Sequence, residues 1–166
     1  HLAATISVGP SAASGPARDD QIRFTVIIPT YNRRKMLEAC LQSVLAQQYP
    51  ASRYEVIIVD DGSTDGTGDF LREREGRGLL RAIYQPRSRG PAAARNAGAR
   101  AAVGEILVFT DSDCVVPPDW LARVDSLFVG NPESAGVGGV QVSMQAQTRG
   151  ERCLAAKARL EDRAGT

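Results

Sequence analysis

The sequence predicts an α/β fold with a mostly parallel β-sheet and helices on both faces. Short runs rich in β-branched residues alternate with segments in which apolar residues recur at helical spacing. The connections between these segments are short, which is typical of βαβ units. Polar clusters follow three of the predicted strands, at the carboxyl ends where parallel sheets bind their ligands.

The predicted strands are apolar runs bounded by turn-forming residues, and we expect Pro29 to end the first of them. In chain order the strands are expected at 24–28, 55–59, 79–84, 105–110 and 136–144. Residues 1–21 are rich in Ala, Ser, Gly and Pro and show no sustained period, so we expect a disordered tail there.

Amphipathic helices are expected between these strands. The first has Asn32 as its N-cap, and the second is capped by Ser63 or Thr64. The third has Pro91 in its first turn and ends at Gly104. The fourth helix is expected over 117–129, and residues 150–163 also have a helical pattern.

Apolar stripes predict the buried face of two of these helices. The stripe of the first helix consists of Met36, Leu37, Cys40, Leu41, Val44 and Leu45. The inner face of the fourth consists of Trp120, Leu121, Val124, Leu127 and Phe128. Both stripes are expected to pack on the sheet.

Length and charge limit the classes of function. A chain of 166 residues fits one domain, and a formal net charge of +1 gives no basic surface for nucleic acid or an anionic membrane. No apolar run approaches the roughly 20 residues that cross a bilayer. No signal peptide is visible, so a cytoplasmic location is expected. Attachment to the cytoplasmic face of a membrane through a part outside this chain stays open.

The residue types present argue against several kinds of site. Cys40, Cys114 and Cys153 are odd in number and widely spaced, which indicates neither a disulfide framework nor a zinc knuckle. The single histidine, His1, lies in the expected tail, so a histidine triad or histidine metal site is excluded. The absence of GxxxxGK[ST] and GxGxxG motifs argues against a P-loop NTPase and a dinucleotide-binding Rossmann domain.

A pair of aspartates follows the fourth strand in "LVFTDSDCVVPPDW". In an extended chain Asp111 and Asp113 project to the same side, so we expect their carboxylates to converge. Two close carboxylates repel each other unless a cation or a proton intervenes. Oxygen-only ligands favour Mg²⁺ or Mn²⁺, which commonly bridges substrate phosphates. A solvated turn that caps the next helix is the alternative interpretation.

Two further clusters are expected at the same edge. Asp60 and Asp61 in "VDDGSTD" exceed what a turn requires, and a carboxylate there can accept a hydrogen bond from a base or a ribose. Tyr31 in "PTYN" either packs or offers a flat face to a nucleobase. A helix start that suits a diphosphate lies beside Arg87, Arg89 and Arg95, although single surface arginines are usually solvated.

In this order and spacing, the motifs P-T-Y-N, V-D-D-G-S-T-D, A-R-N-x-G and D-S-D resemble the nucleotide-binding half of the family 2 glycosyltransferases, which have the GT-A fold. The likeness runs from about Phe24 to about Val142. After the tail expected over 1–21, it implies a donor-binding domain over 22–145 and the start of an incomplete acceptor region over 146–166, so the fold is expected to be truncated.

The resemblance implies a base-binding side of the site. Pro29, Thr30 and Tyr31 would line the base pocket. Asp61, together with Asp60, would meet the edge of uracil or another base.

The resemblance also implies a diphosphate-binding side. Arg95 and Asn96 would lie near the nucleotide, and Asp111 would reach the ribose or the metal. Asp113 would ligate Mg²⁺ or Mn²⁺ on the diphosphate, and the cation would stabilise the leaving nucleoside diphosphate.

The implied activity is inverting transfer of a sugar from a nucleoside-diphosphate sugar, with a UDP-sugar favoured, to a hydroxyl of a glycan, a lipid or a small molecule. Family members use an Asp or Glu base that usually lies well beyond the D-x-D motif. Glu161-Asp162 arrives early and within a helical pattern, so we interpret it as a solvated helix face. We therefore expect the catalytic base to be absent from this chain.

Three alternatives stay open. A catalytically incomplete fragment would bind the donor without transferring sugar. A nucleotidyltransferase on a similar sheet would need a glycine-rich loop after the first strand, and "PTYNRRK" has no glycine. A receiver-like phosphotransferase using Asp60 or Asp61 would need a lysine at a late strand end, but Lys35 and Lys157 both lie on predicted helices.

Overall fold

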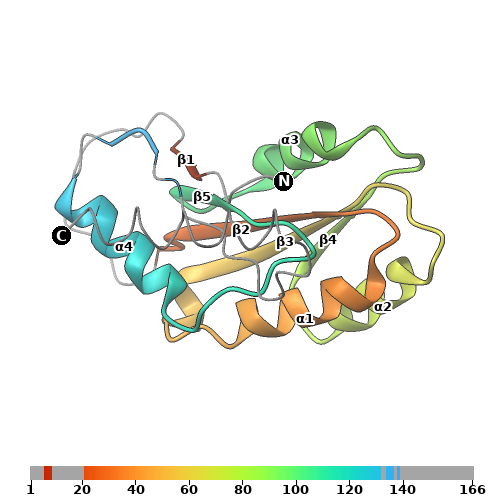
Figure 1. The fold of residues 1–166 in the computed structure, drawn as a ribbon, viewed down its shortest axis with the longest axis horizontal. Helices are drawn as coiled ribbons and strands as arrows, with labels where there is room; N and C mark the ends of the chain where they lie inside the picture. Colours follow the sequence, from red (N-terminus) through yellow and green to blue (C-terminus); the bar gives the residue numbers. More distant parts are fainter. Residues whose placement is uncertain (1–5, 9–20, 132–133, 137, 139–166) are drawn as a thin grey trace, which may run out of the picture.

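A five-stranded sheet forms the centre of the protein, with the strand order β1-β5-β2-β3-β4 (Figure 1). This computed structural model describes residues 6–8, 21–131, 134–136 and 138. Strands β5, β2, β3 and β4 run parallel to one another, and the edge strand β1 pairs antiparallel with β5. The expected α/β class with a mostly parallel sheet is therefore confirmed.

Strands and helices alternate along the chain as expected. The strands are β1 (Ile6–Val8), β2 (Phe24–Thr30), β3 (Tyr54–Asp60), β4 (Arg81–Tyr84) and β5 (Ile106–Phe109). The helices are α1 (Arg34–Leu45), η1 (Ala51–Arg53), α2 (Thr67–Gly76), α3 (Pro91–Ala101) and α4 (Trp120–Gly130), of which η1 is a single 3-10 turn.

Helices cover both faces of the sheet. Helices α1, α2 and α4 pack on one face, against the side of β2 that carries Phe24, Val26 and Ile28, and α3 packs on the other face (Figure 1). Strand β2 is buried along its whole length. Because a central parallel strand is covered on both faces, it reads as a continuous apolar run rather than an alternating one.

Helix α3 approaches the sheet closely at Gly98. A Cβ atom placed on Gly98 would lie 2.5 Å from Ile27 Cγ2 and 3.3 Å from Val59 Cγ2. Ala94, one turn earlier, is also fully buried against Ile57 and Val59. Small residues on this side of α3 therefore set the distance between the helix and the sheet.

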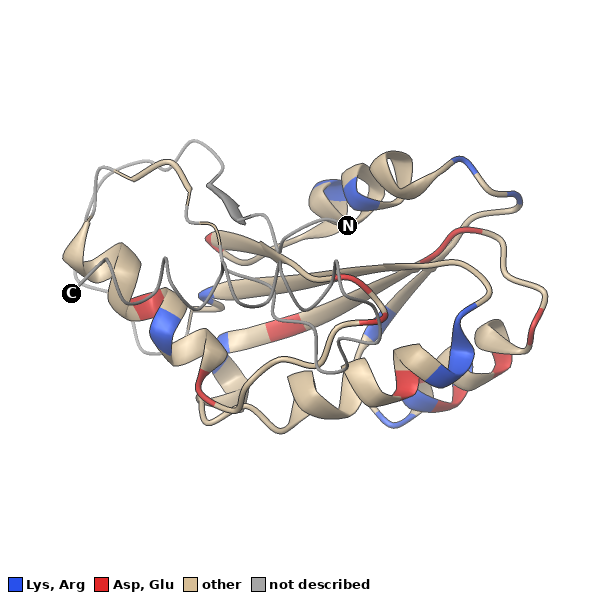
Figure 2. Cartoon of the chain, in the orientation of Figure 1, with Lys and Arg blue, Asp and Glu red and all other residues tan. Residues whose placement is uncertain are grey.

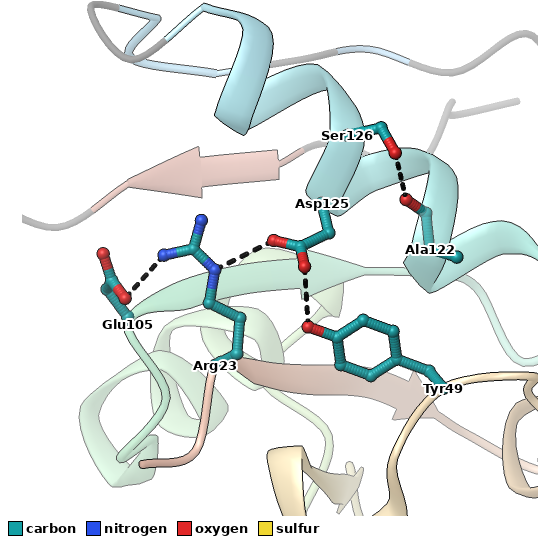
Figure 3. Close-up of polar contacts among 6 residues, drawn as sticks. All are labelled: Arg23, Tyr49, Glu105, Ala122, Asp125 and Ser126. Atoms are coloured by element: carbon teal, nitrogen blue, oxygen red, sulfur yellow. Dashed lines mark hydrogen bonds and ion pairs between the residues drawn. The ribbon is translucent and has the colours of Figure 1, made fainter. Parts of the chain in front are cut away.

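A polar network holds α4 at the amino ends of the strands (Figure 3). Arg23 Nε donates to Asp125 Oδ1 at 3.0 Å, and Arg23 Nη1 pairs with Glu105 Oε2 at 2.6 Å. Tyr49 Oη donates to Asp125 Oδ2 at 2.9 Å. Burial, assisted by this hydrogen bond, raises the pKa of Tyr49 to about 12. The network joins α4, the starts of β2 and β5, and the loop after α1.

Strand β2 does not end at Pro29, which corrects the expected boundary. Thr110 N donates to Ile27 O, so Ile27 faces β5, and Pro29 faces the same side because it is two residues further on. Strand β5 ends at Phe109, which pairs with Ile27. The missing N–H of Pro29 therefore points to a side where no strand remains to accept it.

The caps of α1 and α2 also differ from the prediction. Asn32 adopts a left-handed φ of 51° and precedes the N-cap residue of α1, Arg33. Asp65 Oδ2 accepts the Arg34 N–H at 3.0 Å, so the start of α1 is satisfied from another loop. Helix α2 begins at Thr67 rather than after Ser63 or Thr64, because Gly66 takes a left-handed conformation before it.

Three residues have a different environment from the one predicted. Gly104 lies beyond the end of α3, and a Cβ there would lie 2.6 Å from the backbone of Phe24, so close backbone approach explains this glycine. Met36 is 55% exposed and Leu127 is 45% exposed. Each lies at the edge of its helix's apolar stripe, outside the part of the helix that the sheet covers.

The expected tail is not without structure, because Ile6–Val8 form strand β1 on the edge of the sheet beside β5. Most of the strand expected at 136–144, and the whole helix expected at 150–163, lie outside the described residues. In the part of the chain that the structure describes, no helix is long and apolar enough to cross a membrane.

Candidate functional site

A pocket of about 440 Å³ opens at the carboxyl ends of β2, β3 and β5. The chain leaves β2 toward β3 on one side and later returns as β5 on the other, so the pocket lies where the strand order reverses. The lining residues are Pro29, Thr30, Tyr31, Arg33, Asp61, Ser88, Gly90, Pro91, Ala94, Arg95, Asp111, Ser112 and Asp113.

The pocket brings together most of the predicted site residues, from the end of β2, three loops and α3. Those that line it are Pro29, Thr30, Tyr31, Asp61, Arg95, Asp111 and Asp113. Asp60 and Asn96 do not line it. Asp60 is buried, and its Oδ1 accepts the Ser63 N–H at 3.0 Å, which shapes the turn after β3. Asn96 is exposed on α3.

Several lining residues were not predicted from the sequence, among them the polar residues Arg33, Ser88 and Ser112. Arg33 directly follows the "PTYN" motif, so adjacency to the motif was the available signal. An arginine before a predicted helix is usually solvated, and the pattern gave no reason to prefer another role. Ser88 lies in "RSRG", where the arginines drew the functional interpretation.

The carboxylate of Asp61 holds the loop that leads into α3. Its Oδ2 accepts the Ser88 hydroxyl at 2.6 Å and the Gly90 N–H at 2.9 Å, and its Oδ1 accepts the Arg89 N–H at 2.9 Å. Burial of Asp61 favours the neutral acid, but these hydrogen bonds outweigh it and lower the pKa of the carboxyl. Asp61 therefore stays ionised and fixes the wall formed by Ser88 and Gly90.

Asn32 joins the loop after β2 to the loop after β3. Its backbone N–H donates to Ser63 Oγ at 2.9 Å, and its Oδ1 accepts the Thr64 N–H at 2.8 Å. The left-handed backbone that these contacts require is one that asparagine tolerates better than most residues. The neighbours of Asn32, Tyr31 and Arg33, thus project into the pocket from a fixed backbone.

The wall of the pocket at the end of β2 offers an aromatic face and a hydroxyl group without a hydrogen-bond partner among the described residues. Tyr31 lines the pocket and is 48% exposed. Thr30 Oγ1 is buried and has no hydrogen-bond partner among the described residues. A buried polar atom without a partner is costly, so a polar ligand in this pocket would relieve that cost.

Asp111 and Asp113 lie in a turn, not in the extended chain from which their convergence was predicted. Cys114 N donates to Asp111 O at 3.0 Å, which closes the turn. Asp111 Oδ1 pairs with Arg95 Nη2, and Asp113 Oδ2 pairs with Arg33 Nη1. Figure 2 shows the corresponding basic segments on α3 and at the start of α1. Both aspartates line the pocket, but each has its own arginine.

Helix α1 holds the loop that carries these aspartates. The Cys40 thiol donates to Asp111 O at 3.4 Å, and burial raises the pKa of this thiol to about 12. Just beyond the end of α1, Gln47 Nε2 donates to Pro117 O at 2.8 Å, and Gln47 Oε1 accepts the Leu121 N–H at 3.0 Å. These contacts fix both ends of the segment between β5 and α4.

The donor atoms at Asp111 and Asp113 suit a divalent cation shared with a phosphate ligand. Two carboxylates supply hard oxygen atoms, which Mg²⁺ and Mn²⁺ prefer. Within the described ranges, no group of three or more His, Cys, Asp or Glu side chains is gathered for a metal. Mg²⁺ commonly completes its coordination with water and substrate phosphates. The residues therefore fit a cation held jointly with a diphosphate, not a cage made by the protein alone.

The known proteins that resemble this chain in sequence are glycosyltransferases. The profile of Glycosyl transferase family 2 matches residues 25–162. Glycosyltransferase AglE of Haloferax volcanii is 40% identical over 107 residues, which is 64% of this chain and 35% of AglE. The poly(ribitol-phosphate) beta-N-acetylglucosaminyltransferase TarS of Staphylococcus aureus is 38% identical over 101 residues, 60% of this chain and 18% of TarS. The chain thus spans about a third of AglE and less of TarS.

The solved structures that resemble this chain also include glycosyltransferases. A crystal structure of S. aureus TarS in complex with UDP superposes with a TM-score of 0.62 at 30% identity, covering 67% of this chain and 33% of that one. A mannosyltransferase from Pyrobaculum calidifontis in complex with GDP-Man and Mn²⁺ gives a TM-score of 0.60 at 38% identity, covering 65% and 32%. With a profile match over most of its length and these shared folds, the chain belongs to glycosyl transferase family 2.

Proposed function

We propose that this chain carries the donor site of an inverting glycosyltransferase that uses a nucleoside-diphosphate sugar and a divalent cation, with a UDP-sugar as the favoured donor. One observation carries the proposal. A single pocket at the carboxyl edge of the sheet is lined by Tyr31, Asp61 and both aspartates of the DSD motif. The acceptor is a hydroxyl of a glycan, a lipid or a small molecule.

The base and ribose occupy the side of the pocket formed by the loops after β2 and β3. Tyr31 offers its exposed ring for stacking, and Thr30 Oγ1 supplies a hydrogen-bonding group that otherwise has no described partner. A carboxylate has about four acceptor positions. Asp61 can therefore accept a base N–H through Oδ1 while it keeps its contacts to the loop before α3.

The diphosphate occupies the side formed by the DSD turn and α3. Asp111 and Asp113 hold a divalent cation, which as a Lewis acid stabilises the charge on the leaving nucleoside diphosphate. Arg95 is anchored on α3 beside Asp111 and orients that carboxylate. The TarS complexes with UDP and UDP-GlcNAc and the mannosyltransferase complex with GDP-Man and Mn²⁺ support this class of ligand.

A thermal-shift screen of UDP, GDP and ADP, each with and without Mn²⁺, tests the proposal. A ligand that binds only the native state at 100 times its Kd raises the free energy of unfolding by about 2.7 kcal/mol. We expect UDP with Mn²⁺ to give the largest shift. Asp113→Asn should abolish the part of that shift that depends on Mn²⁺, since it removes a cation ligand.

The matched control is Asp69→Asn, because Asp69 is an exposed aspartate on α2 that does not line the pocket. It should leave the shift unchanged. Failure of all three nucleotides to shift the melting temperature with Mn²⁺ present would refute a nucleotide site. Release of UDP from a UDP-sugar, measured with an added acceptor, separates sugar transfer from donor binding alone. Transfer at an ordinary rate would refute the expectation that the catalytic base is absent.

A further inference from the structure

Arg33 belongs to the pocket but has no role in the donor site described above. It lines the pocket, and its Nη1 pairs with Oδ2 of Asp113. This is the carboxylate that the proposed function assigns to the cation. An oxygen of Asp113 that would ligate the cation is thus already paired with the guanidinium of Arg33.

The backbone of Arg33 is fixed, while its side chain is exposed enough to move. Asn32 before it and Arg34 after it are both hydrogen-bonded to the loop after β3. Arg33 O accepts the Leu37 N–H at 2.9 Å in the first turn of α1. The side chains of Arg33 and Asp113 are 51% and 42% exposed. An ion pair exposed to this degree contributes little stability, so it costs little to exchange its partner.

The charges of the pocket favour such an exchange. Arg33 and Arg95 balance Asp113 and Asp111, and Asp61 is already satisfied by backbone and hydroxyl donors. A divalent cation alone would displace an arginine that then has no anion to bind. A diphosphate alone would be repelled by the carboxylates of Asp111 and Asp113. When the cation and the diphosphate bind together, each displaced group finds an opposite charge.

We propose that Arg33 is a donor-binding residue that exchanges partners: it pairs with Asp113 when no cation is bound, and binds the diphosphate when Asp113 takes the cation. The inference rests on the proposed donor site. A guanidinium suits both positions, because its planar fork of N–H donors matches a carboxylate and a phosphate equally well. Arg33 then couples the two ligands, and linkage requires that each raises the affinity for the other.

Arg33→Gln tests this exchange because it should change the two affinities in opposite directions. The affinity for Mn²⁺ alone, measured by electron paramagnetic resonance of free Mn²⁺, should rise roughly two- to five-fold, since Asp113 loses its competing partner. The affinity for UDP at saturating Mn²⁺, measured by calorimetry on the 166-residue chain, should fall about ten-fold, since a charge-assisted hydrogen bond is lost. A general loss of folding would lower both.

Arg34→Gln is the matched control. Arg34 adjoins Arg33, does not line the pocket, and stacks over the Phe70 ring at 5.9 Å. It should leave both affinities unchanged. Arg33→Lys keeps the charge but not the fork, so it should restore the weak affinity for Mn²⁺ alone and only part of the affinity for UDP.

Equal changes in the two variants Arg33→Gln and Arg34→Gln would overturn the inference, since they would indicate a general charge effect. An unchanged affinity for UDP in Arg33→Gln would overturn it too, because Arg33 would then never reach the diphosphate. These results differ from a failure of the donor site itself, in which the unmodified chain binds neither UDP nor GDP in the presence of Mn²⁺.

Discussion

Two aspartates of the same pocket show how environment divides roles between identical residues. Asp61 is 3% exposed and receives hydrogen bonds from Ser88, Arg89 and Gly90. Asp113 is far more exposed: its Oδ2 pairs with Arg33, and its Oδ1 accepts a long hydrogen bond of 3.8 Å from the Cys114 thiol. Asp61 therefore belongs to the fixed wall of the pocket, whereas Asp113 is free to change its partner. From the sequence, Asp60 and Asp61 are predicted to share one role, because adjacent carboxylates cannot be distinguished without knowing which loop donates hydrogen bonds to them.

Asp61→Asn should destabilise the protein by about 1–3 kcal/mol at neutral pH, because an amide cannot accept all of these donors. The pKa of the Asp61 carboxyl is lowered from its ordinary value of 3.8 in the folded protein. The unfolded state therefore binds more protons near that pH, and the stabilisation is present above 3.8 and is lost as the pH falls through the folded pKa. Denaturant unfolding between pH 7 and pH 3 should show the gap between the two proteins narrowing only at the acid end.

Asp69→Asn again serves as the comparison for Asp61→Asn, because Asp69 is exposed and pairs with Arg72 on its own helix. If the difference in free energy of unfolding between the unmodified protein and Asp61→Asn stayed constant from pH 7 to pH 3, the role given to the ionised Asp61 would be contradicted.

At the level of elements, the positions of helices and strands were more predictable than their ends. Apolar periodicity located α1 and α4, and β-branched runs located β2, β3 and β5. Pro29 is tolerated within β2 because β5, the strand on the side of its missing N–H, has already ended. Asn32 takes a left-handed backbone because it joins the loop after β2 to Ser63 and Thr64 in the loop after β3. Both depend on contacts with segments far along the chain, which local propensity does not encode.

Gly98→Ala tests the close packing of α3. The new methyl group would lie 2.5 Å from Ile27 Cγ2, within the buried face of the helix. Overpacking of this kind costs typically 1–3 kcal/mol, against which alanine gains up to about 1 kcal/mol of helix preference. Gly76→Ala, at the end of α2 with no atom within 4 Å of the added group, receives the gain without the clash. Thermal denaturation should order the variants with Gly98→Ala least stable; the reverse order would show that α3 can move away from the sheet.

On the scale of the whole molecule, a polar network that joins several elements and the candidate binding pocket lie at opposite ends of the sheet. The network of Arg23, Glu105, Asp125 and Tyr49 lies at the amino ends of the strands (Figure 3). The pocket lies at the carboxyl ends. Asp125→Asn should lower the free energy of unfolding by about 1–3 kcal/mol, since it weakens hydrogen bonds from two partners. The affinity for UDP with Mn²⁺ should be unchanged in calorimetry below the melting temperature.

A loss of nucleotide affinity in Asp125→Asn, at a temperature where circular dichroism shows the variant fully folded, would contradict this separation. It would indicate that α4 transmits its position to the DSD turn.

The fold class and most of the lining of the pocket followed from the sequence, because both depend on which residue types follow apolar runs. The arrangement of charges within the pocket did not follow. That Asp113 pairs with Arg33 and Asp111 with Arg95 is set by a turn and by two helices from opposite faces of the sheet. The role of Arg33 therefore became visible only once these segments were placed in space.

The pocket exists because two neighbouring strands have unequal lengths. Strand β2 continues to Thr30, whereas its pairing with β5 stops at Ile27 and Phe109. The opening is thus made by main chain, and Pro29 would prevent β5 from closing it by further pairing. Exchanging the side chains around the rim would therefore change the lining of the pocket while the opening in the backbone remains.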